Sequence, residues 1–207
     1  MGNLSIKIVE STSSITKKIN QGIANIFNKT LSKQRDAILR QVKPIIHSAL
    51  IDSPEIRSLS FGELRIDFGL TSDPSQQIAN AIVNSLDVKS QRASATSIGV
   101  KGGLLITMQP IDYNNLFSLP LAEQITEKGE SLPWLQWLLT FGQQVIIADF
   151  GVEYGPRGRS GGGIMISHRR PFKVRSGYAG TPDDNFITRA VERVSPEIKG
   201  IIRKAMQ

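Results

Sequence analysis

Apolar residues recur at helical spacing through the first quarter of the chain. They are Ile15, Ile19, Ile23, Ile26, Phe27, Leu31, Ile38, Val42, Ile45, Ile46 and Ala49. This spacing gathers them on one face and predicts a long amphipathic helix of roughly 30 residues, starting near Ile15. The serines and threonine at 11–14 offer an N-cap, and Pro44 removes a backbone donor where the helix could bend. Residues 1–14 are expected to form an N-terminal arm, in which 4–10 alternate as a short strand would.

The middle of the chain mixes strand and helix patterns. Residues 58–70 alternate like a strand, but they contain Gly62 and Gly69, so a short helix is an open alternative. Residues 73–86 carry apolar positions at helical spacing and predict a helix. Residues 87–98 and 104–109 alternate, and they predict a β-hairpin that turns near 100–103.

The second half of the chain predicts a buried helix followed by a long hairpin. Residues 110–130 contain two prolines and no periodic pattern, which indicates an extended segment. The helix at 133–142 carries three aromatic residues expected in the core or a subunit interface: Trp134, Trp137 and Phe141. Strands are predicted at 143–154 and 164–167. The glycine-rich segment 155–163 between them is expected to form an exposed tip that cannot belong to a packed core. Two short helices, at 183–190 and 196–206, are expected to end the chain.

These elements define an α+β fold in which the long helix packs on a small antiparallel sheet. The length of 207 residues, 40% of them apolar, suits one domain over 15–207. Polar residues interrupt the most apolar stretch, 134–150, so no membrane association is expected, and the N-terminus does not resemble a secretory signal. The absence of cysteine excludes disulfides and thiolate chemistry and is compatible with synthesis in a reducing cytoplasm.

The net charge of +7 is concentrated in two regions, residues 1–50 and 154–182. Such asymmetry favours a polyanionic neighbour, either nucleic acid or an acidic protein surface, although a solvated basic face is an equal alternative. The candidate contact residues of the second region are Arg157, Arg159, Arg169, Arg170, Lys173 and Arg175. A nucleotide-phosphate cradle in the glycine-rich segment is disfavoured, because a strand rather than a helix follows the glycines.

Residues suited to catalysis are sparse. His47 and His168 lie far apart, and no hydrolase, nucleotide-binding or metalloprotease motif is present. Asp183 and Asp184, with Asp149 and Glu153 elsewhere, could bind Mg²⁺, but two acids at a helix start more often favour the helix dipole. We therefore expect no enzymatic activity, no cofactor and no metal.

Four segments together resemble structural proteins of tailed bacteriophages of the neck, tail-completion and tail-terminator kind. They are SPEIRSLSFGELRIDFGL at 53–70, LPWLQWLLTFGQQVIIADFGVEYGP at 132–156, RSGGGIMI at 159–166 and FKVRSGYAGTPDDNFITRAV at 172–191. The resemblance implies a virion protein that joins capsid to tail around the DNA channel. It further implies a ring of six copies that contacts neighbouring neck, connector or tail proteins, with non-specific DNA contact in the lumen. The alternative is a small basic nucleic-acid-binding domain without enzymatic activity.

Overall fold

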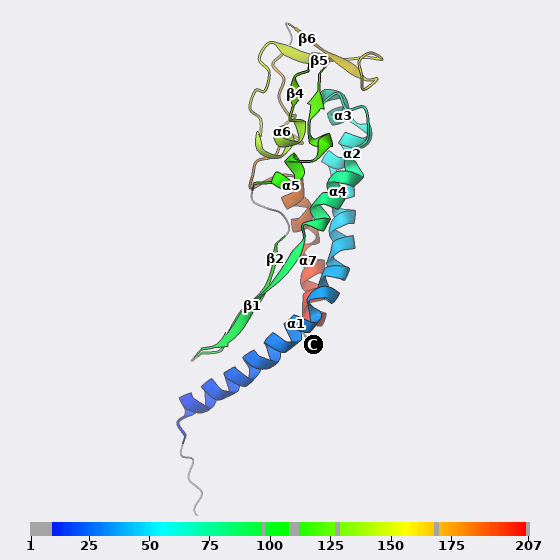
Figure 1. The fold of residues 1–207 in the computed structure, drawn as a ribbon. Helices are drawn as coiled ribbons and strands as arrows, with labels where there is room; N and C mark the ends of the chain where they lie inside the picture. The colour runs from blue at the N-terminus through cyan, green and yellow to red at the C-terminus, as the bar shows by residue number, and fades with distance from the viewer. Residues whose placement is uncertain (1–9, 97, 108–111, 127–128, 168–169, 206–207) are drawn as a thin grey trace, which may run out of the picture.

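The computed structural model describes residues 10–96, 98–107, 112–126, 129–167 and 170–205, which form an elongated molecule (Figure 1). Helix α1 (Thr12–Ile51) runs along most of its length. A body of short helices and hairpins surrounds the C-terminal end of α1. Helix α7 (Phe186–Ala205) lies beside α1. The mixed helix-and-sheet fold expected from the sequence is confirmed. The strand expected at 4–10 lies outside the described residues.

Helix α1 is 40 residues long, so it exceeds the roughly 30 residues expected. It starts where the serines predicted, because the Ser11 hydroxyl accepts a hydrogen bond from the Ser14 amide at 3.3 Å. Its C-terminal half supplies fully buried residues to the core: Leu31, Ile38, Val42, Ile46 and Leu50. The exposed Pro44 is accommodated within the helix.

The segment at 58–70 is largely helical, so the strand prediction was wrong and the alternative of a short helix is correct. Helix α2 (Pro54–Phe61) is capped by Ser53, and α3 (Glu63–Asp67) follows Gly62. Leu64 and Phe68 are four residues apart, which brings both into the core, whereas a strand would also have aligned Ile66 with them. Helix α4 (Ser75–Asn84) forms as its spacing predicted.

The described strands form three separate antiparallel hairpins instead of one sheet. They are β1 (Asp87–Ala95) with β2 (Val100–Thr107), β3 (Gln124–Ile125) with β4 (Ser131–Leu132), and β5 (Phe150–Tyr154) with β6 (Gly163–Ser167). The first hairpin lies along the N-terminal half of α1 (Figure 1). The expected turn at 100–103 was wrong, because those residues belong to β2. The hairpin is instead closed by Thr96, whose amide and hydroxyl both donate to the Gly99 carbonyl. Strand β5 starts only at Phe150, seven residues later than the expected 143.

The chain ends in one continuous helix, so the expectation of two short helices was wrong. Pro196 lies inside α7, whose apolar residues Ile187, Ala190, Val194, Ile198 and Ile201 keep helical spacing through it and pack into the core. Pairing with α1 along this face explains why the proline is tolerated. Within 110–130, the described residues include α5 (Asn114–Phe117) and a 3₁₀ turn (Pro120–Ala122).

Helix α6 (Trp134–Thr140) supplies four buried residues to the core: Trp134, Leu135, Leu138 and Leu139. Trp134 is fully buried, donates from Nε1 to the Leu121 carbonyl at 2.8 Å, and has its ring centre 5.4 Å from that of Phe68. Gly142 follows the helix in the left-handed conformation, with φ of 59°. Among the described residues, none of the helices has the length and apolar character needed to cross a membrane.

Candidate interaction surfaces

The glycine-rich segment forms the connection between β5 and β6, as the sequence predicted. Gly158 has φ of 85°, and a Cβ atom there would lie 2.0 Å from the Gly163 carbonyl oxygen. The end of the segment is packed, contrary to our expectation, because Gly163 is buried and a Cβ at Gly162 would meet Ile66 at 2.6 Å. The glycines therefore serve two needs, a tight turn at the tip and close approach of the strand to α3.

The two arginines of the tip are both exposed but differ in their contacts. Arg159 donates from Nη1 to the Ile125 carbonyl at 2.6 Å, which ties the tip to β3. Arg157 forms no side-chain hydrogen bond or ion pair within the described part of the chain. Of the pair, Arg157 is the cation that is free to meet a partner.

Arg175 belongs to a cluster of charges inside the domain. Its Nη1 lies 2.7 Å from Glu63 Oε2 and its Nε lies 2.8 Å from Asp67 Oδ2. The Tyr154 hydroxyl donates to Asp67 and accepts from Arg175, and the guanidinium carbon lies 5.3 Å from the centre of the tyrosine ring. Burial, reinforced by Asp67, raises the pKa of Tyr154 to about 12. Because two carboxylates neutralise Arg175, it adds little to a positive surface.

Arg170 and Lys173 are exposed in the segment that follows β6, beside Phe172, whose backbone pairs with Ile147. Together with Arg175 and Asp67 they line an open hollow of about 530 Å³. Arg169 and His168 lie outside the described residues. Of the six basic candidates, the structure thus leaves four as exposed cations without an ion pair among the described residues: Arg157, Arg159, Arg170 and Lys173. Of these, only Arg159 is tied to the domain, by its hydrogen bond to the Ile125 carbonyl.

The aromatic candidates of α6 have different environments. Trp134 is fully buried, whereas Trp137 is half-buried, with its ring centre 6.4 Å from that of Phe172. Phe141 is half-buried after the helix ends. The helix is thus a core element with one partly open side.

The carboxylates considered for Mg²⁺ do not converge. Asp183 and Asp184 precede α7, and Asp184 lies 2.7 Å from Arg189, which also pairs with the buried Glu55. In the part of the chain that the structure describes, no group of three histidine or carboxylate side chains could hold a metal ion. His47 is half-buried within α1.

The sequence pattern misplaced one row of exposed apolar side chains. Four isoleucines on the N-terminal half of α1, which we name the isoleucine row, are exposed to solvent: Ile15 (36%), Ile19 (56%), Ile23 (49%) and Ile26 (70%). They were expected to pack on the sheet. The β1–β2 hairpin instead covers an adjacent face of α1 that includes Asn20, Ala24 and Asn28.

Polar contacts hold this unexpected face to the hairpin. Asn20 donates to the Thr96 carbonyl at 3.1 Å, and the Asn28 amide bonds both the amide and the carbonyl of Ala93, at 2.7 and 3.0 Å. A sequence signal was available, because small and amide residues recur at four-residue intervals through Asn20, Ala24 and Asn28.

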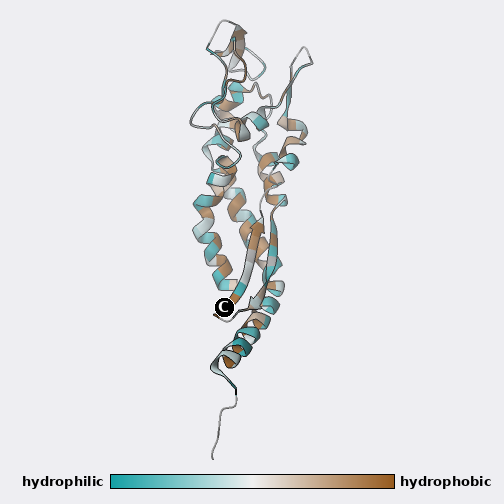
Figure 2. Ribbon diagram, turned by 90° about the vertical axis from the view of Figure 1, so that its left-hand side faces the viewer, coloured by the Kyte–Doolittle hydropathy of each residue, from teal (hydrophilic) through white to brown (hydrophobic). Residues whose placement is uncertain are grey.

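The isoleucine row lies on the part of α1 that α7 does not reach. In Figure 1 the C-terminal end of α7 lies beside the middle of α1, and α1 continues past this point toward its own N-terminus. Figure 2 shows brown, apolar positions recurring along this part of α1. The four side chains together expose the equivalent of about two whole isoleucines, whose burial would contribute about 3–6 kcal/mol.

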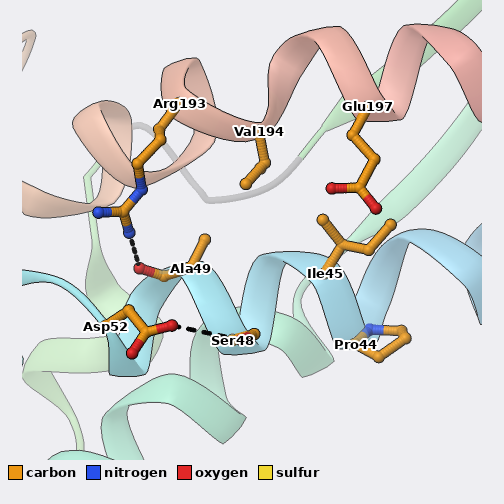
Figure 3. Close-up of a pocket in the computed structure, with 8 residues that line it drawn as sticks. All are labelled: Pro44, Ile45, Ser48, Ala49, Asp52, Arg193, Val194 and Glu197. Atoms are coloured by element: carbon orange, nitrogen blue, oxygen red, sulfur yellow. Dashed lines mark hydrogen bonds between the residues drawn. The ribbon is translucent and has the colours of Figure 1, made fainter.

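A groove lies between the C-terminal part of α1 and the middle of α7 (Figure 3). Pro44, Ile45, Ala49 and Val194 form its apolar floor, and it has a volume of about 580 Å³. Asp52, Arg193 and Glu197 lie at its rim. Arg193 donates to the Ala49 carbonyl, and Asp52 pairs with Arg57 at 2.7 Å. Glu197 is exposed and forms no ion pair with another described residue.

Comparisons with known proteins supply no assignment: no family model, curated protein or solved structure matches the chain.

Proposed function

We propose that the chain is a structural subunit of a phage virion that assembles into a homo-oligomeric ring at the head–tail junction. The isoleucine row carries the proposal. Four neighbouring isoleucines exposed on an extended helix form an apolar surface of the kind that marks a contact with another protein. A subunit that associates head-to-tail closes into a ring when its rotation divides a full turn.

Two further features support a structural role. The segments at 53–70, 132–156, 159–166 and 172–191 resemble phage neck and tail-terminator proteins. The polar clusters in the described residues have structural partners: Arg175 with Asp67 and Glu63, and Arg189 with Glu55 and Asp184. Their positions tie distant segments together, which suits a scaffold.

The alternative is a basic domain that binds nucleic acid. Arg157, Arg170 and Lys173 support it, since all three are exposed without an ion pair among the described residues. The internal pairing of Arg175 weakens it by removing one of the six cations from the candidate surface. Phosphate contacts by the remaining cations would weaken steeply with salt.

The mass distribution of the purified chain at several concentrations, with negative-stain images, tests the proposal. We expect closed rings whose copy number is uniform, with six copies as the resemblance implies. A chain that stays monomeric at every concentration, but binds duplex DNA at low salt and releases it at high salt, would support the nucleic-acid-binding alternative instead.

A further inference from the structure

A short apolar pattern precedes helix α1 in the sequence. Residues 4–8, which we name the arm segment, lie ahead of the described residues. They alternate apolar and polar side chains: Leu4, Ser5, Ile6, Lys7 and Ile8. An extended chain with this pattern carries its three apolar side chains on one face and its two polar side chains on the other. Such a face gains stability by burial against another apolar surface.

The isoleucine row matches the arm segment in length and spacing. The row spans about 16 Å from Ile15 to Ile26, because a helix rises about 1.5 Å per residue. An extended arm segment spans about 13 Å from Leu4 to Ile8. Its apolar side chains would stand about 6.6 Å apart, close to the spacing of about 6 Å between isoleucines that are four residues apart. Three arm side chains therefore fit the three gaps between four isoleucines.

Gly22 leaves space for a close approach in the middle of the row. It lies three residues after Ile19 and four before Ile26, so it shares their side of the helix. Glycine weakens the interior of a helix. A Cβ atom at Gly22 would nevertheless meet nothing within 4 Å, so no neighbour in the described part of the chain requires a glycine there. The backbone of a partner lying on the row would use this space.

We propose that the arm segment of one copy packs on the isoleucine row of the next copy, with Leu4, Ile6 and Ile8 placed between the isoleucines. The contact rests on the proposed ring and specifies how its subunits join. Arm segment and row are different surfaces of one chain. The contact is therefore head-to-tail, and it can propagate from subunit to subunit until the ring closes.

The start of α1 favours the row of the next copy over the row of the same chain. To lie on its own row, the arm segment would have to reverse direction between Ile8 and Thr12. Ser11 is extended, with φ of −69° and ψ of 149°, and its hydroxyl and carbonyl already accept hydrogen bonds from the start of α1. Residues 8–11 contain no glycine, proline, asparagine or aspartate to form a tight turn, and the β-branched Ile8 and Val9 favour extended chain.

Cysteine cross-linking tests the contact directly, because the natural chain contains no cysteine. Ile6 is the central apolar residue of the arm segment, so it faces the middle of the row whichever way the segment runs. Upon mild oxidation we expect the variant Ile6→Cys/Ile23→Cys to form a ladder of covalent oligomers. The matched control is Ile6→Cys/Gln21→Cys. Gln21 is exposed two residues before Ile23, on the opposite side of the helix, so the control should remain largely uncross-linked.

The product of the double-cysteine variant also identifies which chain supplies the arm segment. A disulfide within one chain runs as a monomer of altered mobility on a non-reducing gel. That product in place of the ladder would mean that each arm segment covers its own row, and it would overturn the exchange between copies.

Single-cysteine chains separate the remaining geometries. A mixture of Ile6→Cys chains and Ile23→Cys chains, one of them carrying an affinity tag, should give a covalent heterodimer and no larger product. Covalent dimers of Ile23→Cys alone, at the yield of the mixture, would mean that two isoleucine rows pair. Dimers of Ile6→Cys alone at that yield would mean that two arm segments pair. Either result would overturn the proposed contact.

Polar substitutions on the two faces of the arm segment give an independent measurement. Leu4→Ser/Ile6→Ser/Ile8→Ser should weaken association by at least about tenfold, because three buried aliphatic side chains are lost. The matched control Ser5→Ala/Lys7→Ala changes the opposite face and should alter association by less than about twofold. Circular dichroism should show the same fold in both variants. Rings that form normally with the triple variant would overturn this contact but leave the proposed ring intact.

A double-mutant cycle tests whether the arm segment and the row contact each other. Ile19→Ser/Ile23→Ser changes two exposed residues of the row and should also weaken association by at least about tenfold. Combined with the triple arm variant, it should add little further loss, because each change removes the same contact. Losses that simply add would mean that arm and row have different partners and would overturn the proposal. A wild-type chain that never assembles would contradict the contact and the proposed ring together.

Discussion

Arg175 donates from Nε to Oδ2 of Asp67 at 2.8 Å and so joins the segment after β6 to α3, 108 residues earlier in the chain. The Asp67 side chain is only 7% exposed. A buried carboxylate needs a partner, because transfer from water is costly unless hydrogen bonds replace the lost hydration. The ion pair with Asp67 therefore gives Arg175, a basic residue of the charged region 154–182, a structural role inside one subunit.

Replacement of Arg175 should destabilise the fold more than replacement of its neighbour Lys173. Arg175→Ala leaves Asp67 with Tyr154 as its hydrogen-bond donor, and we expect a loss of about 1–3 kcal/mol in the free energy of unfolding. Lys173→Ala removes the same charge from an exposed position and should change that free energy by less than about 0.5 kcal/mol. Urea denaturation of both variants gives the comparison, and equal losses would remove the structural role of Arg175.

The raised pKa of Tyr154 predicts a loss of stability in alkali. Burial and the negative charge of Asp67 raise the pKa from 10.0 to about 12, so the folded state favours the neutral phenol. Its stabilising contribution is complete below pH 10 and is lost as the pH rises through about 12. Ultraviolet titration of tyrosinate should show one late-titrating group that disappears in Tyr154→Phe. If the variant titrates identically to the wild type, the tyrosine with the raised pKa is not Tyr154.

Periodicity predicted the helices well where one side of the helix faces the core. Helix α4 and the start of α1 at Ser11 follow directly from apolar spacing and capping chemistry. The same criterion failed in the N-terminal half of α1, because exposed isoleucines and buried isoleucines have the same sequence pattern. The long-range contacts of Asn20 and Asn28, with residues 76 and 65 positions away, decide which face is buried.

The sequence predicted a basic region, but it did not predict which partners the arginines of that region contact. Arg157, Arg159 and Arg175 look equivalent in sequence, since all three lie in the stretch 154–182, which contains no acidic residue. Only the fold brings Asp67 to Arg175 and the Ile125 carbonyl to Arg159. Likewise, Pro196 predicted a break in the last helix, but packing along α1 stabilises one continuous helix.

Alanine substitutions at two glycines of the glycine-rich tip should differ in their effect on thermal stability. Gly158→Ala puts a Cβ at a positive φ and against the Gly163 carbonyl, so it should lower the thermal midpoint and loosen the β5–β6 pairing. Gly155→Ala introduces a Cβ into open space with no unusual φ, and it serves as the matched control. Calorimetry distinguishes them, and equal midpoints would argue against the turn described here.

The two tryptophans of α6 should differ in their contribution to stability. Trp134→Ala removes a fully buried ring and its hydrogen bond to Leu121, and should cost about 3–5 kcal/mol. Trp137→Ala removes a half-buried ring and should cost roughly half as much. Denaturant titrations of both variants test this order, and a larger loss at Trp137 would contradict the arrangement of the core.

The hairpin beside α1 should depend on the side chain of Asn28. Strand β1 changes register between Gln91 and Ser94, and Asn28 bonds both backbone groups of Ala93 at that irregularity. Asn28→Ala leaves both groups without this partner, and the missing bonds should cost about 1–3 kcal/mol of local stability. Hydrogen exchange should show faster exchange across β1 and β2, while the body around Trp134 keeps its protection. The exposed, neighbouring Asn25→Ala is the control, and equal exchange in both variants would mean that packing alone holds the hairpin.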